Sequence, residues 1–163
     1  MSSPTGYTRT QIILHWLIAI LIAAQFLFHE AISEAWEVVE KGGEMQPNAL
    51  VFSHVVFGVL ILLLAIWRIS IKIRRGSPAL PAEESRIQQI LAHATHGLLY
   101  LFMLLMPLSG MAAFFGQVEA AAEAHEVMKG ALLLFFLLHF VGALYHRFIL
   151  KSGVMERMLK AED

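Results

Sequence analysis

Four long apolar runs restrict what this chain can fold into more than any other feature of its sequence. Hydrophobic residues make up 58% of the chain and charged residues only 15%, which is too apolar a balance for an ordinary soluble domain. The runs cover residues 12–28, 49–71, 91–115 and 127–150. Each approaches or exceeds the roughly 20 residues that a helix needs to cross a hydrocarbon core. The sequence predicts an all-α fold, a four-helix transmembrane bundle.

The first run resembles a secretory signal sequence only superficially. It is long for such a segment, contains His15 and Gln25, and precedes three similar runs, so we expect a retained span. No repeat, low-complexity tract or phosphate-binding glycine loop occurs, and nothing in the sequence indicates a nucleic-acid partner. Residues 1–163 are therefore predicted to form one integral-membrane domain.

The basic residues predict how the bundle is oriented. Ten of the twelve lysines and arginines flank the start of the first span, the link between spans two and three, or the end of span four. They are Arg9, Arg68, Lys72, Arg74, Arg75, Arg86, Arg147, Lys151, Arg157 and Lys160. Because positive residues stay on the cytoplasmic side, we expect both termini and the middle link in the cytoplasm.

The opposite, outer side is acidic. The outer segments contain eight glutamates and only two lysines, Lys41 and Lys129, which gives a net charge of −6. The glutamates are Glu30, Glu34, Glu37, Glu40, Glu44, Glu119, Glu123 and Glu126. They either solvate the outer loops or form a docking face for a cationic partner, since such fields steer association.

The links carry local structural signals. In residues 29–48, glutamates spaced by three and four suit a short surface helix, which Gly42, Gly43 and Pro47 would end. The third link is rich in alanine, so the fourth helix is expected to begin near Glu119. The middle link reads as a proline-containing turn that leads into the third helix at residues 83–85.

Histidines occur at two depths within the predicted bundle. His54 and His125 lie near the outer ends of spans two and four, and His15 lies near the inner end of span one. His139 follows His125 by fourteen residues, or about 21 Å of helix. The sequence therefore allows an outer pair of histidines and an inner pair.

Paired histidines from facing helices can hold a b-type haem through two axial imidazoles. The chain has no cysteine, which removes thiolate ligands and covalent haem attachment. Two other readings are a histidine that bonds only to a neighbouring helix and a zinc or copper transporter. The spans contain no carboxylate near their middle, where a transport path usually needs one, and this favours haem.

Two further residues, Arg68 and Gly58, fit a reading with two stacked haems, and a third, His29, is an alternative ligand to His54. Arg68 follows His54 by fourteen residues and reaches the inner level, where it could pair with a propionate or simply anchor the helix. Gly58, one turn after His54, leaves space for a flat macrocycle or for close helix packing. His29 follows His15 by fourteen residues, so spacing alone does not decide between His29 and His54.

Four stretches of the chain resemble the bacterial cytochrome b561 family of dihaem membrane proteins. They are "YTRTQIILHWLIAIL", "FSHVVFGVLILLLAIWRI", "LAHATHGLLYLFMLLMPLSG" and "HEVMKGALLLFFLLHFVGALYHRFILKSGVMERML". The resemblance implies that His15 and His139 bind the inner of two non-covalent b haems, and that His54 and His125 bind the outer one. It gives His29 no counterpart. His93, His96 and His146 match recurring histidines that are not axial ligands.

The resemblance implies electron transfer across the bacterial inner membrane between a periplasmic redox partner and the quinone pool. Besides lipid, the expected partners are a quinone and a cationic periplasmic redox protein; a homodimer is left open. His146, His93 and His96 lie where they could serve a quinone and its protons, since imidazole takes both protonation states near neutral pH. Superoxide:ubiquinone oxidoreductase activity is an alternative, but the acidic outer face would repel superoxide, and the link between spans three and four is shorter than in well-studied members.

Overall fold

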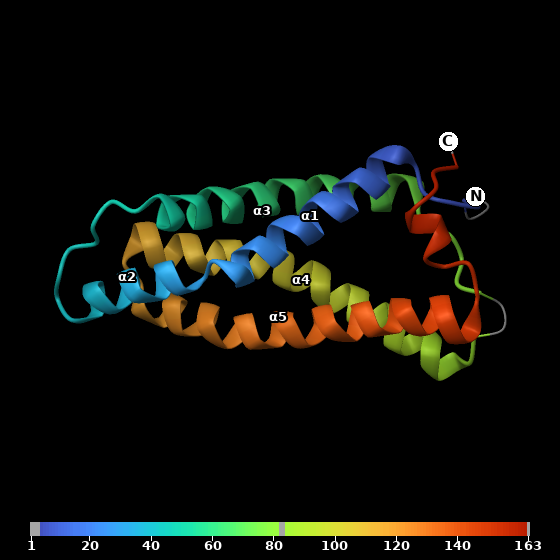
Figure 1. The fold of residues 1–163 in the computed structure, drawn as a ribbon. Coiled ribbons are helices and arrows are strands. Elements are labelled where there is room, and N and C mark those ends of the chain that lie inside the picture. Colours follow the sequence, from blue (N-terminus) through green and yellow to red (C-terminus); the bar gives the residue numbers. More distant parts are fainter. Residues whose placement is uncertain (1–3, 82–83, 163) are drawn as a thin grey trace.

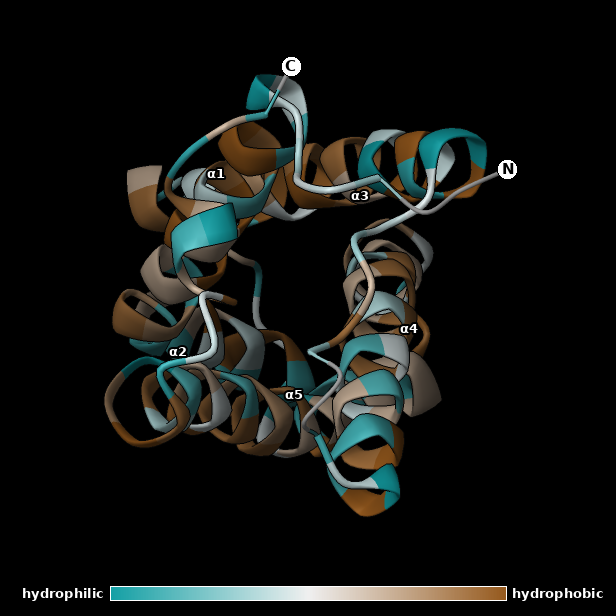
Figure 2. Ribbon diagram, turned by 90° about the vertical axis from the view of Figure 1, so that its right-hand side faces the viewer, coloured by the Kyte–Doolittle hydropathy of each residue, from teal (hydrophilic) through white to brown (hydrophobic). Residues whose placement is uncertain are grey.

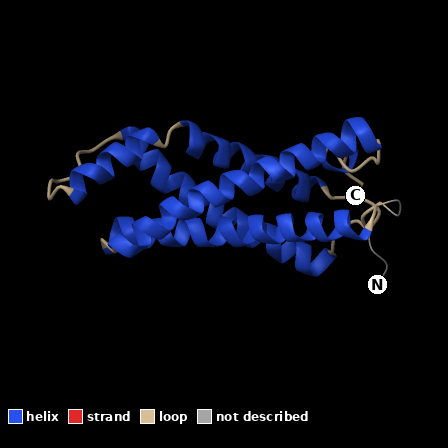
Figure 3. Ribbon diagram, turned by 90° about the horizontal axis from the view of Figure 1, so that it is seen from below, coloured by secondary structure: helices blue, strands red, loops and turns tan. Residues whose placement is uncertain are grey.

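The regular structure of the protein is helical in the computed structural model, which describes residues 4–81 and 84–162 (Figure 1). Five α-helices follow one another: α1 (Arg9–Leu27), α2 (Glu30–Glu40), α3 (Ala49–Arg75), α4 (Arg86–Gly116) and α5 (Glu119–Tyr145). A π-helical turn, His146–Leu150, continues α5, and a 3-10 turn covers Glu156–Met158. No strand occurs in the described part of the chain (Figure 3). All helices except α2 are long and apolar enough to cross a membrane, which confirms the predicted fold class.

Polar residues at the helix ends explain where the helices begin. The Thr8 hydroxyl accepts a hydrogen bond from the Gln11 amide at 3.2 Å, while the Gln11 side chain accepts one from the Thr8 amide at 3.0 Å. Such a reciprocal pair satisfies backbone groups that the first turn leaves free. Ser85 caps α4 in the same way, and Asn48 caps α3. The predicted surface helix in the first outer link is confirmed as α2, and the predicted start of the last helix at Glu119 is confirmed as well.

The long helices pack in the order α1–α3–α4–α5 and surround a common axis (Figure 2). Their shared core is a cluster of buried aliphatic residues. It consists of Leu14, Ile18, Leu21, Ile22, Ile61, Leu64, Ala65, Met103 and Leu132. Large apolar side chains remain exposed on the outside of all four long helices, as on Ile20, Leu63, Leu105 and Leu134. A contiguous apolar exterior is typical of a surface that faces lipid.

The two ends of the bundle differ in charge. Both chain ends lie at one of them (Figure 1), where the Glu162 amide donates to the Tyr7 carbonyl at 3.0 Å. Burial raises the pKa of the Tyr7 phenol, and the nearby Arg68 partly opposes this. We call this the basic end, because it holds most of the lysines and arginines. The acidic end holds α2 and the junction of α4 with α5. That the basic end is cytoplasmic stays a prediction.

Candidate functional site

The histidines of α5 form two pairs with histidines of other helices. His125 lies opposite His54 of α3, with ring centroids 6.3 Å apart and ring planes at 64°. His139 lies opposite His15 of α1, with centroids 5.9 Å apart and planes at 76°. Because fourteen residues separate the two α5 histidines, the pairs lie about 21 Å apart along that helix. The structure therefore brings together the four histidines that were predicted as an outer and an inner pair.

A mostly apolar cavity surrounds the outer pair. Its lining includes His54 and His125 together with Gln25, Gly58, Met106 and Gly110. His29 also lines this cavity, but its Nδ1 donates to the Phe26 carbonyl at 2.9 Å, and its side chain is exposed at the start of α2. The structure thus pairs His54 with His125 and places His29 at the rim.

The ring of His125 is fixed by α4. Its Nδ1 donates to the Met106 carbonyl at 2.9 Å and lies 3.1 Å from the Ser109 hydroxyl. A carbonyl oxygen can only accept, so the proton is on Nδ1 and the Nε2 lone pair remains available. Histidines that bind a metal are usually oriented in this way by a partner of their other ring nitrogen. Sequence reasoning missed both partners, although the polar "LSG" in an apolar span was a signal.

Gly110 provides the space for that ring. A Cβ atom at this position would lie 3.1 Å from His125 Cε1, so the ring would have to shift. We expect Gly110→Ala to weaken retention of a cofactor at the outer pair on the order of tenfold, as loss of an orienting partner does at metal sites. Absorption spectra recorded before and after dialysis measure how much cofactor each variant retains. Gly116→Ala is the matched control, since its Cβ would meet only the Val118 side chain at 3.4 Å. Equal retention in both variants would contradict the expectation.

The ring of His54, unlike that of His125, is not oriented by a hydrogen bond at Nδ1 to any described residue. Its Nδ1 is buried without a hydrogen-bond partner in the part of the chain that the structure describes, which is costly unless a bound group compensates. Its backbone carbonyl accepts a hydrogen bond from the Gln25 side chain at 2.9 Å, and this contact ties α1 to α3 beside the cavity. Gly58, predicted to leave room for a macrocycle, does line the cavity; a Cβ there would lie 3.6 Å from Gln25 Nε2.

The inner pair has a third histidine beside it. The ring of His96 lies 4.9 Å from that of His139, and its Nδ1 donates to the Ala92 carbonyl at 2.6 Å. Arg68 contacts Gln11, one helical turn before His15, so it does lie near the inner level. Its guanidinium donates to the Gln11 carbonyl and thereby joins α3 to α1. His93 and His146 lie nearer the basic end.

Both pairs fit a planar metal cofactor held between two imidazoles. With metal–nitrogen bonds of about 2 Å, two imidazoles on opposite sides of a metal have ring centroids roughly 6 Å apart, close to both observed separations. Within residues 4–81 and 84–162, no group of three or more histidines or carboxylates could hold a metal ion. Each pair therefore offers two ligands, which suits a macrocycle such as haem that carries its remaining ligands itself.

Membrane-length helices that present facing histidine pairs are the arrangement of a membrane haem protein. The family model described as "Prokaryotic cytochrome b561" matches residues 6–161, and the chain belongs to that family. It is similar to a protein of Cereibacter sphaeroides named "Cytochrome b562", with 35% identity over 98% of this chain and 99% of that protein. It is also similar to the "Probable superoxide oxidase CybB" of Yersinia pestis, with 27% identity over 94% of this chain and 95% of that protein. The protein is therefore a multi-pass bacterial membrane cytochrome of a family that transfers electrons.

Proposed function

We propose that the protein holds two b-type haems and moves single electrons across the bacterial inner membrane, between a periplasmic redox partner and the quinone pool. His54 and His125 would bind the outer haem, and His15 and His139 the inner one. Haem iron supplies a reversible one-electron change. The observation that carries the proposal is the presence of two facing histidine pairs at two levels of one helix, α5.

The chain's own residues have three tasks in this proposal. The Met106 carbonyl and Gly110 hold the His125 ring at the cavity, with Nδ1 engaged and Nε2 left free for a ligand bond. The apolar cavity lining excludes water, and Arg68 places a positive charge near the inner level, where a propionate would need one. The basic end, with His93, His96 and His146, is the end proposed to meet the quinone in the cytoplasmic leaflet.

A haem count tests the proposal directly. We expect the purified protein to contain two non-covalent b haems per chain and to show a b-type reduced-minus-oxidised spectrum with two overlapping components. Extraction with acidic acetone should release both haems, since no cysteine is present to bind them covalently. One haem per chain, or none, would overturn the proposal.

Superoxide:ubiquinone oxidoreductase activity is the second candidate, because the relative from Yersinia pestis is named a probable superoxide oxidase. All eight glutamates of the acidic end are exposed, and the net charge of −6 there would repel an anionic substrate. Quinone reduction that depends on added superoxide would establish this activity instead. A metal transporter is disfavoured, since no group of three or more histidines or carboxylates among the described residues could hold a metal ion.

A further inference from the structure

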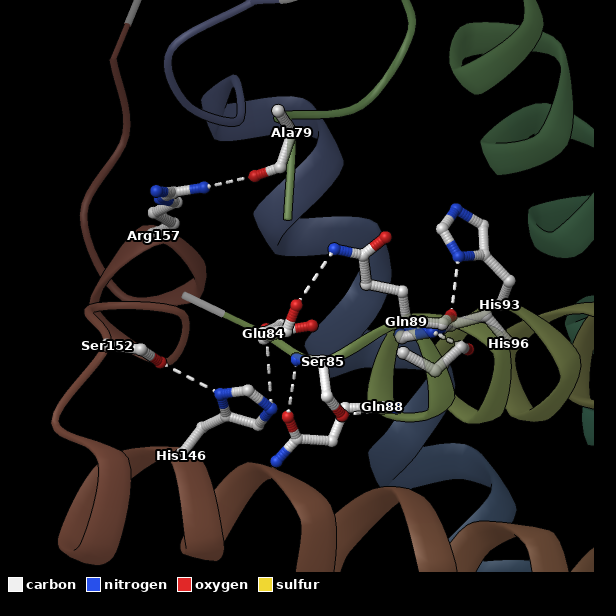
Figure 4. A network of polar contacts seen from close by, with 11 residues as sticks. Ala79, Glu84, Ser85, Gln88, Gln89, His93, His96, His146, Ser152 and Arg157 are labelled. Carbon is white, nitrogen blue, oxygen red and sulfur yellow. Dashed lines mark hydrogen bonds and ion pairs between the residues drawn. The ribbon is translucent and has the colours of Figure 1, made fainter. Parts of the chain in front are cut away.

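Glu84 is a buried carboxylate that the proposed electron path does not use. It lies two residues before α4, where the middle link passes beside the end of α5 (Figure 4). Its side chain is 2% exposed, and neither carboxylate oxygen has a hydrogen-bond partner among residues 4–81 and 84–162. A buried ionised carboxylate without partners is strongly unfavourable. The fold therefore keeps an acid in a place that needs either a proton or a nearby positive charge.

His146, at the start of the π-helical turn, is the group that faces this acid. Its Nε2 lies 3.6 Å from Glu84 Oε1, and its Nδ1 lies 2.8 Å from the Ser152 hydroxyl (Figure 4). The first distance is within reach of an ion pair but too long for a direct hydrogen bond. Burial favours the two forms of the pair without net charge: carboxylic acid with neutral imidazole, or carboxylate with imidazolium. Both forms hold one transferable proton.

The pair is connected to the helix that leads to the inner histidines. The Gln89 side chain donates to the Glu84 carbonyl at 3.2 Å, and the Gln89 carbonyl accepts from His93 Nδ1 at 2.7 Å. One turn further along α4, His96 lies against His139. His146 itself follows His139 by seven residues, or about 10 Å of helix. The proton-holding pair thus lies between the inner histidine pair and the basic end.

We propose that Glu84 supplies protons, through His146, to a quinone bound at the basic end. This inference rests on the proposed function. Reduction of a quinone to a quinol takes two electrons, delivered singly by the cytochrome, and two protons. For each proton, the N–H bond of His146 at Nδ1, where the Ser152 hydroxyl now lies, breaks as an O–H bond forms on the quinone, and in the same step the O–H bond of Glu84 breaks as an N–H bond forms at Nε2. A proton then taken up from the cytoplasm at Nδ1 sends the Nε2 proton back to the Glu84 carboxylate, which restores the pair for the next transfer. Quinol oxidation runs these transfers in reverse.

Glu84→Gln tests the inference, because it keeps the size of the side chain and removes its exchangeable acid. The measurement is the rate at which a soluble short-chain quinol reduces the haem-loaded protein. The rate of reduction by dithionite, which needs no quinol, is the control. We expect the quinol rate to fall at least about tenfold, since positioned acid–base groups contribute that much or more. The dithionite rate and the haem content should stay as in the wild type. Glu156→Gln, at a half-exposed glutamate of the same end that pairs with Arg147, should change neither rate.

Two further variants separate a proton role from a structural one. His146→Gln should slow the quinol reaction as much as Glu84→Gln, and the double variant should be no slower, because both changes interrupt one transfer. Glu84→Asp, which keeps the acid, should restore a large part of the rate. A slow Glu84→Asp variant with full haem content would assign Glu84 a packing role and overturn the inference.

The outcomes distinguish this inference from the function on which it rests. If quinol does not reduce the wild-type protein, the quinone part of the proposed function fails, and the inference fails with it. If quinol reduces the wild type and the Glu84→Gln variant within twofold of each other, only the role of Glu84 is overturned. Should Glu84→Gln not assemble, His146→Gln decides, and a rate within twofold of the wild type counts against the pair.

Discussion

His125→Ala is expected to remove one of two haems from the purified protein and to leave the other spectrally unchanged. The variant deletes an imidazole whose ring lies 6.3 Å from that of His54, so the outer haem would keep a single axial ligand. His54→Ala should have the same effect. His15→Ala and His139→Ala should remove the inner haem instead, because their rings form the other pair at 5.9 Å. Haem content per chain and the reduced-minus-oxidised spectrum of each variant provide the measurement.

His29→Ala is the matched control for this series. His29 lines the outer cavity, yet its Nδ1 is engaged by the Phe26 carbonyl and its side chain is exposed. We therefore expect the His29 variant to keep both haems. His96→Ala should also keep both, although the inner spectrum can shift because His96 lies 4.9 Å from His139. A His29 variant that loses a haem, beside a His54 variant that keeps two, would reverse the outer assignment.

The second large effect concerns the acidic end and ionic strength. All eight glutamates there are exposed, while both lysines pair with a glutamate three or four residues earlier: Lys41 with Glu37 at 3.2 Å and Lys129 with Glu126 at 2.5 Å. Electron exchange with a basic soluble cytochrome should therefore slow on the order of tenfold between low ionic strength and a few tenths molar salt, because screening shortens the reach of the field. Stopped-flow mixing at a series of salt concentrations measures the slope.

Variants in which glutamates of the acidic end are neutralised show which residues cause the salt dependence. Replacing Glu30, Glu34 and Glu37 of α2 with glutamine should flatten the salt dependence and lower the rate at low ionic strength. The reaction with an uncharged quinol is the internal control, since it is proposed to occur at the opposite end and should respond little to salt. A slope that is the same in the variant and the wild type would mean that these glutamates only solvate the surface.

Sequence periodicity and composition predicted the helices well, because each long apolar run can satisfy its backbone only as a helix in the membrane. The ends were less predictable. The third apolar run begins at residue 91, and its helix was expected to start at residues 83–85; α4 begins at Arg86, where Ser85 and Gln88 form a capping box. The second was expected to stop at residue 71, but α3 continues to Arg75, because basic side chains are favourable at a helix C-terminus.

For the site, residue spacing could predict only which side chains share a face of one helix. Spacing placed His125 and His139 on one face of a helix, but it could not choose between His29 and His54, which depends on how α1 and α3 pack. Glu84 was missed for a different reason. A glutamate in a proline-containing link resembles a solvated helix start, whereas the Glu84 side chain is buried beside His146, from a distant part of the chain. Contacts between segments that are distant in the sequence leave no periodic pattern from which they could be predicted.

The order of helix packing has a consequence for how the protein accumulates in the cell. Helix α5 makes its extensive contacts with α4, whereas its paired histidines face α1 and α3. Under the haem proposal, the cofactor itself joins α5 to the first half of the bundle, and ligands that bind only the folded state stabilise it by mass action. Chains made during iron or haem starvation would then lack this closure and be open to membrane proteases. The abundance of the protein is expected to follow the haem supply of the cell, even at constant transcription.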